Sequence, residues 1–187
     1  MTLWLARHAQ PLTPPGVCYG ATDLAADRLA TRQAALALAA ALPAALHVMS
    51  SPLQRCSGLA EALQAVRPEL VYQTDARLAE MDFGCWEGWR WDRIGRTEID
   101  RWTADFGDYR FGGRESVQML LDRVASARRH AAALAGRDGS RADVLWITHA
   151  GVIRAAGLLA RGIDTVVRAD QWPAEAIGFG QWQRQAL

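Results

Sequence analysis

Short apolar runs alternate with amphipathic stretches along most of the chain. Runs of this length are typical of strands buried inside a sheet, where both faces of the strand are covered. They predict five strands, at residues 2–7, 46–49, 70–73, 143–148 and 176–182.

The stretches between these runs carry helix signals. Asp27 and Ser116 are good N-cap residues, and apolar side chains follow each of them at helical spacing. Ser51 and Gln54 fit a capping box, with Pro52 at the first helical position. Strands that alternate with helices predict an α/β layered fold, with helices at residues 28–42, 52–66, 117–135 and 150–161.

Residues 84–113 interrupt this alternation. They hold seven of the chain's aromatic residues, interleaved with charges and without a clear period. We interpret them as an irregular, partly helical cap within a single domain that spans residues 1–187. The cap either packs over the site as a shield or offers a stacking face to a planar substrate ring. Core packing is the commoner role for most of its tryptophans.

The composition narrows the classes of function. The chain has 187 residues, of which 50% are hydrophobic, and its formal net charge is +1. It therefore has no overall basic field that would attract nucleic acid or an anionic membrane. All 21 basic residues are arginine, so an arginine by itself is no sign of a phosphate site.

The cysteines and the N-terminus indicate the compartment. The chain has three cysteines, Cys18, Cys56 and Cys85, with no CxxC spacing. An odd number without that spacing argues against a disulfide framework and against a zinc site. The first apolar run is too short for a signal sequence or a membrane span. We therefore expect a cytoplasmic protein that binds no metal.

Two of the predicted strands end in the same way. The first strand ends at Arg7-His8, and the later one ends at His149, after which Ala150 and Gly151 begin a helix. In a wound sheet, strand ends that are distant in sequence meet in one crevice. These side chains are therefore predicted to form one site.

A third strand end adds Arg55, on the first turn of the helix that follows Ser51. Guanidinium groups match phosphate oxygens, and helix N-termini favour anions. Two imidazoles, two guanidiniums and the N–H groups of two helix starts would bind a phosphate dianion without a metal ion.

His8 is the candidate nucleophile of this site. Neutral imidazole is a competent nucleophile, and nearby cations lower its pKa from about 6.5. The leaving alkoxide also needs a proton, for which a carboxyl group is the natural donor. Glu80, Asp82 and Glu87 are the candidates, and Glu87 is interpreted as a brace for the turn at residues 86–88.

Four segments together resemble the histidine phosphatase superfamily, the group that includes the cofactor-dependent phosphoglycerate mutases. The resemblance covers residues 3 to 162, and its order and spacing are more specific than any one motif. The motifs are Arg7-His8, Ser50-Ser51-Pro52-Leu53-Gln54-Arg55-Cys56, Arg77-Leu-Ala-Glu80 with Gly84-Cys-Trp-Glu-Gly88, and Thr148-His149-Ala-Gly151.

The resemblance implies a three-layer α/β/α sandwich with a mostly parallel mixed sheet. His8 would carry the phosphoryl group as phosphohistidine, and Glu80 would be the proton donor. Arg7, Arg55 and His149 would clamp the phosphate. The implied substrate-binding set is Arg7, Arg55, His149, Thr22, Ala150 and Gly151, and neither a metal nor a cofactor is implied.

Within the superfamily, the loop at residues 16–23 and the compact length are most similar to the α-ribazole phosphatase branch of cobalamin assembly. The chain departs from the family at Ala9 and Gln10, where Gly-Glu is usual, and at Pro14-Pro15. These departures concern the loop and the substrate more than the phosphohistidine chemistry.

The resemblance leaves three hypotheses about function. The first is a phosphomonoesterase acting on α-ribazole 5′-phosphate or a similar small phosphate ester. The second is a phosphoglycerate mutase or a broad-specificity sugar phosphatase, and the third is a non-catalytic phosphate-binding module. We expect a small-molecule partner, no nucleic acid or membrane partner, and a monomer or homodimer.

Overall fold

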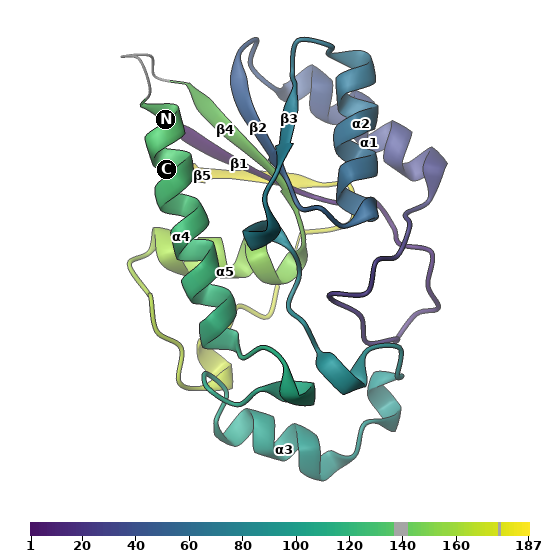
Figure 1. Ribbon diagram of the computed structural model, residues 1–187, viewed down its shortest axis with the longest axis vertical. Coiled ribbons are helices and arrows are strands. Elements are labelled where there is room, and N and C mark those ends of the chain that lie inside the picture. Colours follow the sequence, from purple (N-terminus) through teal and green to yellow (C-terminus); the bar gives the residue numbers. More distant parts are fainter. Residues whose placement is uncertain (137–141, 176) are drawn as a thin grey trace.

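The computed structural model describes residues 1–136, 142–175 and 177–187. Its centre is a five-stranded sheet with the strand order β3-β2-β4-β1-β5 (Figure 1). All neighbouring strands are parallel except β5, which pairs antiparallel with β1. The strands are β1 (Thr2–Arg7), β2 (Leu46–Ser50), β3 (Tyr72–Thr74), β4 (Asp143–Thr148) and β5 (Trp182–Ala186).

Helices cover both faces of this sheet, which confirms the predicted three-layer α/β/α fold. α1 (Arg28–Ala41) and α2 (Gln54–Val66) pack on one face, while α4 (Val117–Ala135) and α5 (Ala150–Ala160) pack on the other (Figure 1). Among the described residues, none of the helices has the length and apolar character needed to cross a membrane.

The alternation of side chains along β1 creates two separate cores. Leu3 and Leu5 belong to the cluster beneath α4 and α5, whereas Trp4 and Ala6 belong to the cluster beneath α1 and α2. Successive strand residues point to opposite faces of a sheet, so a strand covered on both faces has apolar residues at every position. This is the physical reason for the continuous apolar run at residues 2–7.

The local helix signals were confirmed at two N-termini. An Asp27 carboxylate oxygen accepts a hydrogen bond from the Ala30 N–H at 2.7 Å, and the Ser116 hydroxyl accepts one from Met119 at 3.2 Å. Gly136 is the C-cap of α4, as its position in the sequence indicated.

The predicted start of α2 was wrong. The helix begins at Gln54, and Leu53 rather than Ser51 is its N-cap residue. The Ser51 hydroxyl accepts a bond from the Leu53 N–H at 3.3 Å, and the Gln54 N–H donates to the Asp23 carboxylate at 2.7 Å. A partner from a distant loop therefore replaces the predicted capping box.

The last strand also lies later than predicted, at Trp182–Ala186 instead of 176–182. Its pairing with β1 stops at Trp182, opposite Ala6. The preceding loop includes Gly180, which has a φ of 71°, and the Gly180 N–H donates to the His8 carbonyl at 3.0 Å. The loop thus follows the end of β1 and the strand starts only after it. Residue 176 lies outside the described part of the chain.

The aromatic-rich stretch at residues 84–113 is irregular and partly helical, as predicted. It contains α3 (Arg96–Ala104) and three short 3₁₀ turns, and it forms the end of the molecule beyond the carboxyl ends of the parallel strands (Figure 1). Trp102 stacks on Phe111 with ring centroids 4.4 Å apart and on Phe106 at 5.4 Å. Most of these aromatic rings therefore pack against one another.

Candidate active site

The sheet brings the two predicted histidines together. β1 and β4 are parallel neighbours with Arg7 opposite Thr148, so His8 and His149 leave adjacent strand ends at the same level. Their ring centroids lie 5.1 Å apart. The His8 backbone N–H donates to the Thr148 carbonyl at 3.1 Å, which ties the two strand ends to each other.

One ring nitrogen of His8 is occupied by the backbone. Nδ1 lies 2.7 Å from the Ala9 carbonyl oxygen, and because a carbonyl can only accept, Nδ1 carries the proton. The lone pair of the neutral ring is therefore on Nε2. Burial lowers the pKa of His8 to about 3, and the charges of Arg55 and Arg7 act in the same direction. His8 is thus a neutral imidazole whose Nε2 carries the lone pair.

Ala9 and Gln10, which follow His8, contribute to this turn through their backbone carbonyl groups. Ala9 contributes its carbonyl oxygen, and its small side chain is buried. Gln10 is exposed, and its carbonyl accepts a bond from the Asp27 N–H at 2.8 Å. Neither side chain replaces a contact of the His8 ring.

His149 is held between two side chains. Nε of Arg55 donates to its Nδ1 at 3.3 Å, which leaves the proton on Nε2, 2.8 Å from the Ser51 hydroxyl oxygen. Complete burial lowers the pKa of His149 well below its usual value, and His8 and Arg55 add to this. Both nitrogens have protein partners here, so its predicted contact with phosphate stays a prediction.

Arg55 is fully buried and organises the loop before α1. Its Nη1 donates to the Thr22 carbonyl at 2.7 Å and its Nη2 donates to the Gly20 carbonyl at 2.5 Å. The Thr22 hydroxyl and N–H both contact the carboxylate of Glu87. The Thr22 side chain is therefore part of this loop brace. Glu87 holds this loop and the Phe83 N–H, at 3.1 Å, instead of the turn at residues 86–88 that the sequence indicated.

Arg7, beside His8, has a donor without a hydrogen-bond partner among the described residues. Its Nη1 donates to the Ile177 carbonyl at 2.7 Å, and its guanidinium lies 3.8 Å from the ring centroid of Phe179. Its Nε is buried and has no hydrogen-bond partner among the described residues. Buried charged donors are almost always paired in folded proteins, so this atom fits an anionic ligand.

Glu80 lies at the N-terminus of α5. One carboxylate oxygen accepts from the Gly151 N–H at 3.0 Å and the other from the Met81 N–H at 3.1 Å. A Cβ atom at Gly151 would lie 2.3 Å from the Glu80 carboxylate, so only glycine leaves this space open. The helix start after His149 thus receives the carboxylate of Glu80, as helix N-termini favour negative charge.

Asp82 is the other candidate proton donor, and its contacts stabilise a local turn. Its carboxylate accepts from the Gly84 N–H at 2.8 Å and lies 3.4 Å from Nε of Arg114. These contacts close the turn that leads into the aromatic-rich stretch. Glu80, and not Asp82, therefore lies at the helix start that follows His149.

A cavity of about 410 Å³ adjoins Glu80 and Gly151. Aromatic and aliphatic side chains form most of its wall, and Glu80 and Arg154 are the charged residues that line it. Nε1 of Trp102 is buried without a hydrogen-bond partner in the described residues. The aromatic members of the wall are Phe83, Trp91, Trp102, Phe106 and Trp172.

Two residues near the nucleophile were missed by the sequence reasoning. The Tyr19 phenol lies beside Arg7 and Arg55, and burial raises its pKa. The Phe179 ring lies 5.5 Å from that of His8. Tyr19 belongs to the loop motif at residues 16–23, so the sequence could have indicated its place near the site. No local sequence pattern indicates that Phe179 lies near His8.

The cysteines and possible metal ligands add no further chemistry at this site. Cys18 and Cys56 are buried, and burial raises the pKa of the Cys18 thiol to about 12. Within residues 1–136, 142–175 and 177–187, no group of three His, Cys, Asp or Glu side chains is arranged to hold a metal ion.

Comparison with known proteins identifies the family of this chain. The family model described as the histidine phosphatase superfamily (branch 1) matches residues 3–170. A mycobacterial glucosyl-3-phosphoglycerate phosphatase matches with a TM-score of 0.78 and 25% identity, over 98% of this chain and 88% of that chain. TTHB049 from Thermus thermophilus matches with a TM-score of 0.71 and 28% identity, over 98% and 92%. No curated protein matches the sequence.

Proposed function

Because the chain belongs to branch 1 of the histidine phosphatase superfamily, we propose that it hydrolyses phosphate monoesters through a phosphohistidine at His8. Its family and its phosphatase neighbours make it a phosphoric monoester hydrolase. The observation that carries the mechanism is the Nδ1 contact of His8 with the Ala9 carbonyl, at 2.7 Å, which leaves Nε2 as the nucleophilic atom.

In the first step, the lone pair of Nε2 of His8 attacks phosphorus. An N–P bond forms while the P–O bond to the ester oxygen breaks, and Glu80 gives its proton to that oxygen. The Ala9 carbonyl stabilises the positive charge that develops on the ring, through the proton on Nδ1. Arg7, with its uncommitted Nε, stabilises the phosphoryl oxygens.

In the second step, water attacks the phosphorus of phosphohistidine. The Glu80 carboxylate accepts a proton from this water, the N–P bond breaks, and its electron pair returns to Nε2 of His8. Inorganic phosphate leaves and both residues regain their first state. The positive charge at the site comes from arginine, so this sequence of steps needs no metal ion.

For the substrate, we propose α-ribazole 5′-phosphate, in which a planar benzimidazole base is carried by the ribose phosphate. The cavity beside Glu80 supports this proposal, because Glu80, the proposed proton donor to the leaving alcohol, lies in its wall together with five aromatic rings. Such rings stack on planar bases. Arg154, at the same cavity, would instead suit an acidic alcohol such as a phosphoglycerate.

Turnover of a panel of phosphomonoesters in EDTA tests this function. The panel contains an aryl phosphate, α-ribazole 5′-phosphate, phosphoglycerates, phosphoserine and sugar phosphates. We expect release of inorganic phosphate in EDTA, with the highest kcat/KM on α-ribazole 5′-phosphate. Phosphoryl transfer between phosphoglycerates without phosphate release would indicate a mutase, and no turnover at all would indicate a binding module.

Gly151→Ala is expected to slow turnover of alkyl phosphates while stability stays nearly unchanged. The added methyl would lie 2.3 Å from the Glu80 carboxylate, which has to move. A misplacement of about 1 Å in a reacting group lowers rates by about 100-fold. Alanine is favoured over glycine inside a helix by about 1 kcal/mol, so the fold tolerates the change.

Steady-state kinetics and thermal unfolding measure the two effects of Gly151→Ala. Gly157→Ala is the matched control, because it lies in the same helix and a Cβ there meets nothing within 4 Å. A kcat equal to that of the wild type in Gly151→Ala would show that the position of Glu80 is unimportant.

A further inference from the structure

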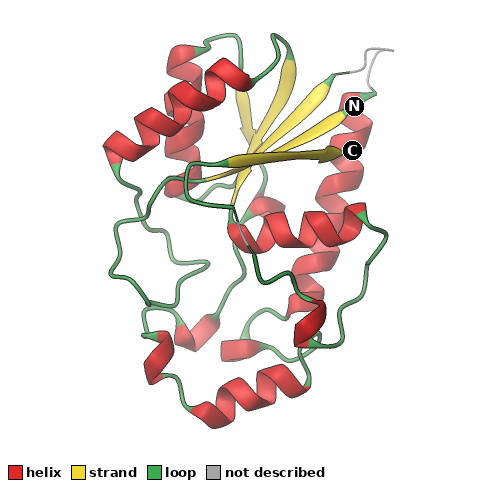
Figure 2. Ribbon diagram, turned by 180° about the vertical axis from the view of Figure 1, so that it is seen from behind, coloured by secondary structure: helices red, strands yellow, loops and turns green. Residues whose placement is uncertain are grey.

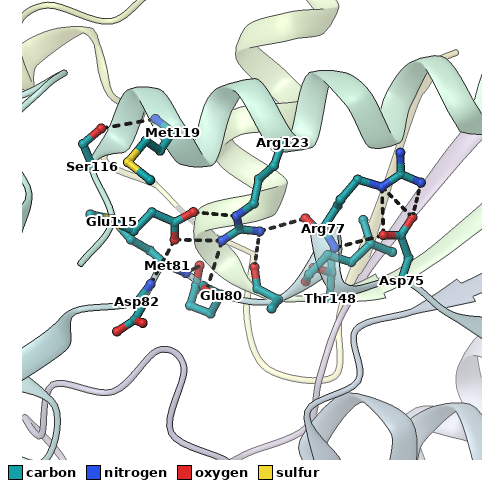
Figure 3. Close-up of polar contacts among 12 residues, drawn as sticks. Asp75, Arg77, Glu80, Met81, Asp82, Glu115, Ser116, Met119, Arg123 and Thr148 are labelled. Atoms are coloured by element: carbon teal, nitrogen blue, oxygen red, sulfur yellow. Dashed lines mark hydrogen bonds and ion pairs between the residues drawn. The ribbon is translucent and has the colours of Figure 1, made fainter.

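Arg123 is a largely buried cation that the mechanism above does not use. It projects from α4 toward the segment that holds Glu80 (Figure 3). Its Nη1 donates to the Arg77 carbonyl at 2.7 Å and to the Ala79 carbonyl at 2.6 Å, and its Nη2 donates to the Glu80 carbonyl at 3.1 Å. One guanidinium thus binds three backbone carbonyls around Glu80.

Glu115 fixes this guanidinium from the other side. Its carboxylate accepts from Nε of Arg123 at 2.6 Å and from Nη2 at 3.0 Å, which is a bidentate pair (Figure 3). The same carboxylate accepts the Asp82 N–H at 3.0 Å. The side chains of Arg123 and Glu115 are only 20% and 12% exposed, so solvent screens this pair weakly.

The segment at residues 77–82 needs such support because most of its backbone lies outside the sheet and the helices. β3 ends at Thr74, and after the short 3₁₀ turn at Ala76–Leu78 the chain is irregular. Its carbonyl groups must therefore find partners elsewhere. The Thr148 hydroxyl donates to the Leu78 carbonyl at 2.7 Å, and Arg123 supplies the contacts on both sides of that point.

We propose that Arg123, locked by Glu115, is the positioning residue that holds the Glu80 carboxylate in place for proton transfer. Arg123 touches neither substrate nor phosphate in this mechanism and acts on Glu80 through the backbone of residues 77–82. The inference rests on the proposed function, because it assigns Arg123 a part in the proton transfer by Glu80.

This role predicts a dependence on the leaving group. A poorly acidic alcohol such as glycerol needs a proton as it leaves, whereas dinitrophenolate leaves without one. Because kcat/KM reports only the steps up to release of the alcohol, loss of position at Glu80 should lower kcat/KM for an alkyl phosphate and spare it for 2,4-dinitrophenyl phosphate. A general weakening of the fold or of phosphate binding would slow both substrates alike.

The test compares Arg123→Met with Arg129→Met, the same change at an exposed arginine of the same helix. For Arg123→Met we expect kcat/KM on glycerol phosphate to fall about 100-fold, as for a group misplaced by about 1 Å, with less than about 3-fold change in kcat/KM on 2,4-dinitrophenyl phosphate. Arg129→Met should leave both rates unchanged. Arg123→Met in a Glu80→Gln background should add no further loss on glycerol phosphate.

Two outcomes would overturn the inference: an equal fall on both substrates, or no fall on glycerol phosphate. Glu115→Gln, which keeps the size of the side chain and removes its charge, should shift the ratio of the two rates in the same direction. It carries the test if Arg123→Met does not fold. Failure of the proposed function is distinguishable, because the wild type would then hydrolyse neither ester or His8→Ala would remain active.

Discussion

His8→Ala is expected to lower kcat/KM by at least about 10⁴-fold, because the phosphohistidine intermediate cannot form without the nucleophile. The imidazole is buried and its Nδ1–H is bound to the Ala9 carbonyl, so its Nε2 is oriented in advance. Alanine supplies neither a nucleophile nor the ring that contacts Phe179 and His149.

The measurement is turnover of an aryl phosphate together with labelling by a radioactive phosphate ester. The wild type should form an acid-labile label during turnover, as phosphohistidine does, and His8→Ala should form none. His130→Ala, at an exposed histidine on α4, is the control and should keep the label and the rate. Full activity in His8→Ala would exclude the mechanism.

The second large effect is a loss of stability in mild acid. Burial lowers the pKa of His8 from 6.5 to about 3, so below pH 6.5 the unfolded chain binds a proton that the folded chain does not. The stability is thus fully present above pH 6.5 and decreases as the pH falls toward 3. The pKa of His149 is lowered for the same reason, so it adds a contribution of the same sign.

The size of this loss of stability follows from the difference in proton binding between the unfolded and the folded chain. His8 costs about 1.4 kcal/mol per pH unit in this window, so at pH 5 it lowers the free energy of unfolding by about 2 kcal/mol, and His149 adds to this loss. Urea unfolding at pH 7.5 and pH 5 measures the difference. His8→Gln, which cannot be protonated, should lose about 2 kcal/mol less than the wild type between these pH values. Equal urea midpoints for the wild type at both pH values would contradict the expectation.

Local signals in the sequence were enough to predict most of the fold. The run at residues 143–148 became β4 with the same bounds, and Asp27 and Ser116 cap the helices that they were expected to cap. These features depend on neighbouring residues, so the sequence pattern contains them. Arg55 also has the predicted place on the first turn of α2, although that helix starts later than expected.

The remaining features depend on contacts between distant residues. The Gln54 N–H bonds to Asp23, 31 residues away, and this contact replaces the predicted capping box. Phe179 lies on Arg7 because the last loop follows the end of β1, and no local pattern contains that contact. Arg123 looks like any helix-surface arginine in a chain whose basic residues are all arginine. Only the fold shows that it reaches the Glu80 segment.

The place of β1 in the sheet has a consequence for how the chain folds during synthesis. β1 leaves the ribosome first, yet its two neighbours in the sheet are β4 and β5, so that the two ends of the chain lie side by side (Figure 2). β1 therefore has no neighbouring strand to pair with until residues 143–148 emerge. Pairing over such long sequence separations is slow and leaves apolar surface exposed. The nascent chain should thus be a substrate for chaperones until the strand that bears His149 has been made.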